Sequence, residues 1–147
     1  MIGDRIHGRT WRPLGAAMIV ALTSLGSYSC IAAAADLKIA LAGDQEVPPV
    51  KSAGYGTGTI TIGADGAVSG SVVTTDISGT AAHIHEAAKD RNGPVIIPLT
   101  KDGNTYSAPA GAKLTELQLA SFRAGNLYVN VHTAANPGGE IRAQLIP

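Results

Sequence analysis

The sequence has little cysteine, few large aromatic residues and little charge. It contains one Cys, one Phe and one Trp among 147 residues, and only 15% of its residues are charged. A single cysteine excludes an intrachain disulfide, and low charge with 45% apolar residues excludes a disordered chain. Eighteen glycines indicate many turns, so the core is expected to consist of Val, Ile, Leu and Ala. The length suits one domain.

The first 35 residues have the pattern of a signal peptide. Three arginines precede an apolar stretch at residues 14–25, and small residues ending in four alanines follow it. This pattern predicts export, with cleavage after Ala34 or Ala35. The alternative is a membrane anchor, for which the apolar stretch is shorter than the roughly 20 residues that cross a bilayer. A lipid anchor on Cys30 is not favoured, because no Leu-type residue stands three positions before it.

Residues 36–147 remain as the expected mature domain. If cleavage follows Ala35, Cys30 leaves with the signal peptide and no thiol nucleophile is left. The domain then carries eight Lys or Arg against ten Asp or Glu. This slightly acidic balance does not favour nucleic acid or an anionic membrane as partner. We expect a periplasmic or secreted protein with an extracytoplasmic partner of unknown kind and no stable membrane insertion after cleavage.

Short β-type segments separated by turn residues dominate the expected mature domain. Strands are predicted at residues 37–42, 55–62, 68–75, 80–86, 94–99, 127–133 and 140–146. One helix is predicted at residues 114–124, with Thr115 as its N-cap and Gly125 at its end. This spacing predicts an all-β fold with one short helix. We expect an antiparallel Greek-key sandwich or barrel of immunoglobulin-like or superoxide-dismutase-like type.

Three of the four histidines lie in two of the predicted strands. Residues i and i+2 of a strand share a face, so His83 and His85 point the same way and Ile84 points the other way. An H-x-H pair on one rigid strand is a good half-site for Cu, Zn, Ni or Fe. His132 would complete a three-histidine metal site if its strand packs alongside. The alternative is that each imidazole is a structural hydrogen-bonding group.

Glu140 and Arg142 stand two apart and share the polar side of the last predicted strand. Glu140 is a candidate for a carboxylate that orients a metal-bound histidine, and Arg142 for a residue close to the metal. The alternative is that they form an ion pair or bridge to neighbouring strands. No paired acids, nucleophile elbow or phosphate loop appears. No catalytic residue is therefore assigned, and a non-enzymatic role is favoured.

Three segments together resemble the CHRD (chordin-type) domain family: LAGDQEVPPV at 41–50, AAHIHEAAKDRNGPVIIPL at 81–99 and LTELQLASFRAGNLYVNVHTAANPGGEIRAQL at 114–145. Ala143 stands where the family often has Gly. The resemblance covers nearly all of residues 36–147 and implies an extracytoplasmic β-sandwich. In animals the domain occurs in chordin, an extracellular antagonist that binds bone morphogenetic proteins. That function is not transferred on the basis of the fold alone.

A weaker, local resemblance links residues 82–86 (AHIHE) to the copper-ligand strand of copper-zinc superoxide dismutases. It implies that His83 and His85 are copper ligands and that His132 is the late ligand. Those enzymes also need a bridging His, further zinc ligands and a disulfide, for which the mature chain lacks the residues. A zinc-bridged dismutase is therefore excluded, and a mononuclear copper site is left.

Three functions are consistent with these observations. The first is a non-catalytic extracytoplasmic binding or structural module. The second is a periplasmic copper-binding protein that uses a three-histidine site, with redox or dismutase-like chemistry. The third is an adhesion or matrix-type interaction domain whose exposed loops bind the partner. Copper is the one cofactor that these hypotheses name.

Overall fold

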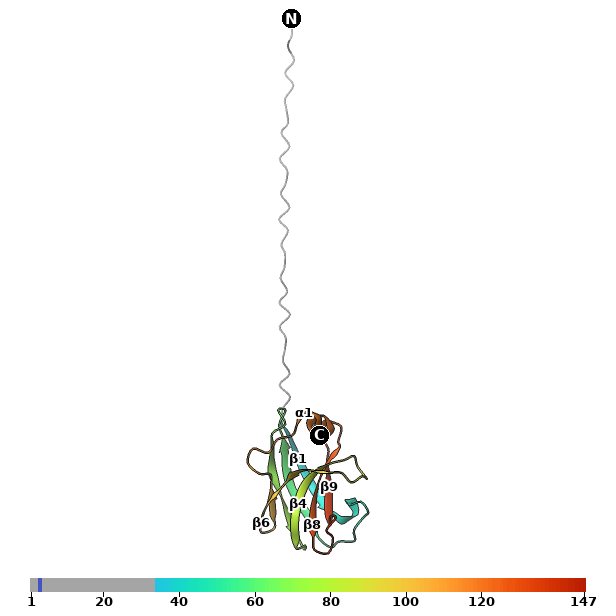
Figure 1. Cartoon of the computed structure of the whole chain (residues 1–147). Coiled ribbons are helices and arrows are strands. Elements are labelled where there is room, and N and C mark those ends of the chain that lie inside the picture. Colours follow the sequence, from blue (N-terminus) through green and yellow to red (C-terminus); the bar gives the residue numbers. More distant parts are fainter. Residues whose placement is uncertain (1–2, 4–33) are drawn as a thin grey trace. The chain divides into compact units, whose positions relative to one another are not determined.

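The structure, a computed structural model, describes Gly3 and residues 34–147 (Figure 1). Most of the expected signal peptide, residues 1–35, therefore lies outside the described residues. The described chain forms nine strands, one α-helix and one 3-10 helix. In chain order they are β1 (Ala35–Ala42), η1 (Gly43–Gln45), β2 (Tyr55–Ile62), β3 (Val68–Thr75), β4 (Gly79–Glu86), β5 (Val95–Pro98), β6 (Thr100–Asp102), β7 (Thr105–Ser107), α1 (Glu116–Arg123), β8 (Leu127–Thr133) and β9 (Ile141–Leu145).

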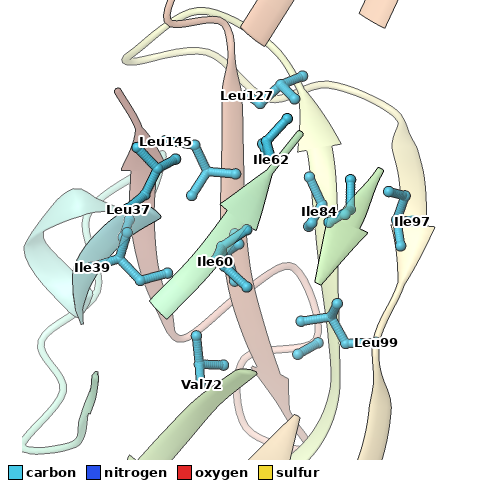
Figure 2. Close-up of a cluster of buried hydrophobic side chains, with 14 of the residues drawn as sticks. Leu37, Ile39, Ile60, Ile62, Val72, Ile84, Ile97, Leu99, Leu127 and Leu145 are labelled. Atoms are coloured by element: carbon cyan, nitrogen blue, oxygen red, sulfur yellow. The ribbon is translucent and has the colours of Figure 1, made fainter. Parts of the chain in front are cut away.

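The strands form one antiparallel sheet in the order β5-β4-β8-β9-β1-β2-β3-β7-β6. Strands that are distant in the sequence pair with each other, as the Greek-key prediction requires, because β4 pairs with β8 and β9 with β1. The β1–β9 pairing has a single register pair, Ala42 with Arg142. The sheet curls into a nearly closed sandwich or barrel, and side chains from strands that face each other meet inside it (Figure 2).

The core between the two halves is built mainly of branched aliphatic side chains, as the composition predicted. Alternation along each strand supplies them: Ile60 and Ile62 from β2, and Ile84 from β4, point to the inside (Figure 2). Tyr106 and Phe122 are the aromatic members of this cluster. Apolar burial of this kind is the main favourable contribution to folding.

The predicted all-β fold with one helix is confirmed, and most predicted strands agree with the observed ones to within two residues. The hairpin of β6 and β7 was missed. Its turn at residues 102–104 is visible in the sequence, and Gly103 there has a φ of +57°. Its strands have only three residues each, which is too short for a period-two pattern to stand out.

Helix α1 begins and ends where its capping residues predicted. The Thr115 side chain accepts a hydrogen bond from the Gln118 N–H, and the Gln118 side chain accepts one from the Thr115 N–H, which completes a capping box. Gly125 follows the helix with a φ of +73°, a conformation that favours glycine. Leu119 and Phe122 anchor the helix to the core.

Strand β8 is buried on both sides. Val129 and Val131 face the apolar core, while Tyr128 and Asn130 on the opposite face are each only 2% exposed. The predicted division into an apolar and a polar side is thus present, but the polar side is also covered. The loops at 43–54 and 87–94 lie over it, and Asn92 Nδ2 joins them by donating to the Val47 carbonyl at 2.6 Å.

The two outer strands of the sheet order are β5 and β6. Strand β5 follows Pro94 and ends in Pro98, and all three residues of β6 are exposed. Among the described residues, no helix combines the length and the apolar character needed to cross a membrane.

Neighbouring valines on β3 give a test of the core. Val72 is fully buried, whereas Val73 is 47% exposed. We expect Val72→Ala to lower the free energy of unfolding by about 2 kcal/mol, because two methyl groups leave a packed core. The same change at Val73 should cost no more than about 0.5 kcal/mol. Urea denaturation of both variants measures the difference, and equal losses would contradict the assigned faces.

Candidate metal centre

The pairing of β4 with β8 places the three predicted histidines on one face. His85 lies opposite Tyr128, His83 opposite Asn130, and His132 opposite Ala81. The register shifts next to His132, between Gly79 and Ala81, and on the other side of β4 it shifts beside His85. Such irregularities re-aim side chains and are common beside functional sites.

The ring nitrogens of the three imidazoles lie close to one another. His83 Nδ1 lies 3.0 Å from His132 Nε2, and one ring nitrogen from each of the three histidines lies within 4.8 Å of the others. A metal ion binds imidazole nitrogen at about 2.0–2.1 Å, so its ligand atoms lie within about 4 Å of one another. The closest pair already meets this limit, and in the metal-free protein it is joined by an N–H···N hydrogen bond that a shared ion would replace.

Two of the histidines have one ring nitrogen held by a backbone carbonyl. His85 Nδ1 lies 3.0 Å from the Gly93 oxygen, and His132 Nδ1 lies 3.0 Å from the Pro137 oxygen. A carbonyl only accepts, so each Nδ1 carries the proton and each Nε2 keeps a lone pair. Histidines that bind metals show this arrangement, in which the second nitrogen donates to a carbonyl or carboxylate.

Burial keeps two of these imidazoles neutral. It lowers the pKa of His83, and the neighbouring His132 and His85 lower it further. Burial also lowers the pKa of His85, against an opposing effect from the Gly93 carbonyl. Because only the neutral imidazole has a lone pair for a metal, these shifts favour the form that binds an ion near neutral pH.

Arg142 reaches the histidines only through Tyr128. The Tyr128 ring stacks on His85 with centroids 4.7 Å apart and an interplanar angle of 7°. The Arg142 Cζ lies 3.4 Å from the centroid of the same Tyr128 ring, at cation–π distance. The guanidinium donates to Asn92 Oδ1 at 3.3 Å and to Gln144 Oε1 at 3.1 Å. Arg142 is 1% exposed, so it is a buried support of this stack.

Glu140 lies outside direct contact with the imidazoles. Its carboxylate accepts hydrogen bonds from Ser52 Oγ at 2.7 Å, Thr133 Oγ1 at 2.5 Å and Asn136 Nδ2 at 3.2 Å. These bonds, with the one from Thr133 the most influential, lower its pKa. The carboxylate thereby joins the loop at 134–139 to the loop at 43–54. The first of these loops supplies the carbonyl that orients His132.

Of the two structural alternatives for Glu140 and Arg142, an ion pair between them is wrong, whereas both residues contact the neighbouring strand β8, through Thr133 and Tyr128. Glu140 accepts from hydroxyl and amide groups, and Arg142 donates to amide oxygens. Among the described residues, an ion pair joins Lys113 to Asp65 on another part of the surface. Although the two residues share the polar side of the sheet, their partners differ: Glu140 bonds to Thr133 at the end of β8 and to two loops, and Arg142 bonds to Gln144 on β9 and to Asn92 in the loop at 87–94.

Glu46 and Asn130 are the site residues that the sequence interpretation missed. Glu46 is 5% exposed, and burial raises its pKa although Arg142 and Asn130 oppose the shift. Asn130 lies on the strand face shared with His132, which the alternation of the strand shows. The only feature of the sequence that marks Glu46 is its place in the EVPPV segment.

Fold and site together define a class: an all-β module with converging imidazoles on a loop-covered face. The family model of the CHRD domain matches residues 37–145. The chain therefore belongs to the CHRD domain family, as its three segments predicted. CHRD domains are generally of extracellular type, so the chain is a module of the extracytoplasmic type. Neither a curated protein nor a solved structure matches the chain.

We expect opposite pH dependences from Glu46→Gln and Glu140→Gln in the metal-free protein. The raised pKa of Glu46 makes its ionisation in the fold unfavourable, a cost that appears as the pH rises above the ordinary value of 4.5. The lowered pKa of Glu140 gives a stabilisation that is present above 4.5 and is lost as the pH falls through the lowered value.

Urea denaturation between about pH 3.5 and pH 7 measures both effects. Relative to the wild type, Glu46→Gln should gain stability as the pH rises, and Glu140→Gln should lose it. Two pH dependences of the same sign would show that one of the two carboxyl environments is wrongly described.

Proposed function

We propose that this chain is an exported, non-catalytic CHRD-domain module that binds one copper ion through His83, His85 and His132. The observation that carries the proposal is the convergence of three imidazoles, two of which have Nδ1 engaged by a backbone carbonyl. Copper is assigned because Cu²⁺ binds a given nitrogen site most tightly among the divalent first-row metals.

A binding role is supported by how the site is enclosed. His85 is 7% exposed, and the loop residue Gly93 holds one of its nitrogens. Arg142, which the resemblance to dismutases placed near the copper, is buried behind Tyr128. A charge there is poorly placed to guide an anionic substrate to the ion. Redox or dismutase-like activity is the alternative, and superoxide consumption above that of free copper would favour it.

Export is the second part of the proposal. It is supported by the basic start, the short apolar stretch and the alanine-rich exit of residues 1–35, and by the extracytoplasmic type of the family. The periplasm or the exterior is the location we propose, and the partner there is unknown.

The purified mature domain should bind one equivalent of Cu²⁺, measured by titration calorimetry and metal analysis. Each of His83→Ala, His85→Ala and His132→Ala should weaken binding by at least about 100-fold, because a ligand is lost from a preformed set. Thr61→Ala, which removes a hydrogen bond to Asp36 on β1, is the control and should bind normally. Equal copper in all variants, or tighter binding of Zn²⁺ than of Cu²⁺, would refute the copper assignment.

Export is tested by expressing the full chain in a bacterial host and weighing the recovered protein by mass spectrometry. The periplasmic or secreted fraction should begin at Ala35 or Asp36. Ile19→Arg, which breaks the apolar stretch, should keep the chain uncleaved inside the cell. The matched control is Ile146→Arg at an exposed position, which should be exported normally. Recovery of the uncleaved wild type in membranes would instead indicate an anchor.

A further inference from the structure

Three buried polar atoms at the histidine cluster, one of them on His85 itself, have no hydrogen-bond partner. Four buried side-chain atoms of the described residues lack a partner: Glu46 Oε1, His85 Nε2, Tyr106 OH and Asn130 Oδ1. Tyr106 lies in the apolar core. The other three residues are neighbours, because Glu46 Oε1 and Asn130 Nδ2 both pack against Gly139, and Asn130 lies diagonally from His85 in the strand register. Buried polar atoms are rarely left unpaired, so a group of three calls for an explanation.

The surroundings of Asn130 determine which way its amide points. Asn130 Nδ2 approaches the Gly138 oxygen at 3.4 Å. Nδ2 and Glu46 Oε1 both pack against Gly139, where an added Cβ would lie 2.6 Å and 2.4 Å from them. The reversed amide would turn its oxygen toward the Gly138 carbonyl, which also accepts. The amide therefore keeps its nitrogen on this side, and Oδ1 turns away from it.

Asn130 Oδ1 and His85 Nε2 are then two acceptors in one buried place. His85 Nδ1 carries the proton that the Gly93 carbonyl accepts, so His85 Nε2 has a lone pair and no hydrogen. Two lone pairs next to each other repel unless a hydrogen-bond donor or a cation stands between them. A metal ion satisfies both at once.

The strand register puts Asn130 at the centre of the histidine cluster. It lies directly opposite His83 on β4, diagonally from His85, and two residues from His132 on its own strand and face. Residues that are directly opposite have Cβ atoms about 5 Å apart, and diagonal neighbours are still in reach of long side chains.

We propose that Asn130 supplies its Oδ1 as the fourth ligand atom for the ion held by His83, His85 and His132. The site then has three nitrogens and one amide oxygen, and the Gly138 carbonyl holds the amide in the ligating orientation. This inference rests on the proposed function, because it concerns the same ion. It adds the residue that completes the coordination and tunes the affinity.

The test compares copper binding and the electron paramagnetic resonance spectrum of Cu²⁺ in Asn130→Leu and in the wild type. Leu has nearly the same size and no ligand atom. We expect its copper affinity to fall at least about 10-fold, and the copper hyperfine splitting to change because an oxygen ligand has left. Asn104→Leu, in the exposed turn between β6 and β7, is the matched control and should leave both readouts unchanged.

A second variant keeps the proposal testable if Asn130→Leu does not fold. The double change Glu46→Gln/Asn130→Asp exchanges the amide and the carboxylate, so one amide and one carboxylate still lie beside Gly139. A charged oxygen then faces the ion, and copper should bind about 10-fold more tightly with a changed spectrum. An affinity and a spectrum unchanged from the wild type would overturn the inference.

The outcomes separate this inference from the proposed function. A wild-type domain that binds no copper overturns both. Copper that is lost in the histidine variants but bound normally, with an unchanged spectrum, in Asn130→Leu overturns only the fourth ligand. In that case a water molecule that donates to His85 and Asn130 satisfies the buried atoms.

Discussion

The antiparallel register between β4 and β8 is the constraint on which the rest of the site depends. Side chains alternate along a strand, so a slip of one residue would send His83 and His85 into the apolar core and Ile84 out of it. Ile84, Val129 and Val131 prevent this slip, because each is fully buried on the inner face. Packing on one side of the sheet therefore sets the polar geometry on the other, although no histidine takes part in that packing.

The covered polar face of the sheet is stabilised in a different way from the apolar core behind it. Its groups must find partners, because water is largely shut out. Backbone carbonyls of two separate loops orient His85 and His132, and the Glu140 carboxylate holds one of those loops in place. The Tyr128 ring stacks on His85 and also contacts the Arg142 guanidinium. The buried charge of Arg142 is therefore stabilised both by this aromatic contact and by its hydrogen bonds to Asn92 and Gln144. The imidazoles are thus pre-oriented by loop carbonyls and by an aromatic ring, and Gly93 joins the two by donating to the Tyr128 hydroxyl.

Local patterns in the sequence account for much of this arrangement. Period-two alternation places His83 with His85, and Tyr128 with Asn130 and His132, on shared faces, and a capping residue and a glycine delimit α1. The pairing of β4 with β8 is long-range, and local pattern does not reveal it, so the sequence left it as a condition of the three-histidine site. The burial of Glu46 and the partners of Glu140 come from loops at 43–54 and 134–139. Such loops have no periodicity. From the sequence alone, Arg142 was therefore expected near the metal, and Glu46 was not expected at the site.

The two edge strands described above also determine how this domain meets other chains. An exposed strand edge is a template on which a foreign strand adds by main-chain hydrogen bonding, and this is a route to amyloid-like assembly. Here Pro98 lacks the N–H that such pairing needs on β5, and Lys101 and Asp102 place charge on β6. A domain protected in this way resists strand addition by another chain. Its loops and side chains are then the parts left to contact other molecules, and they can change while the sheet stays the same.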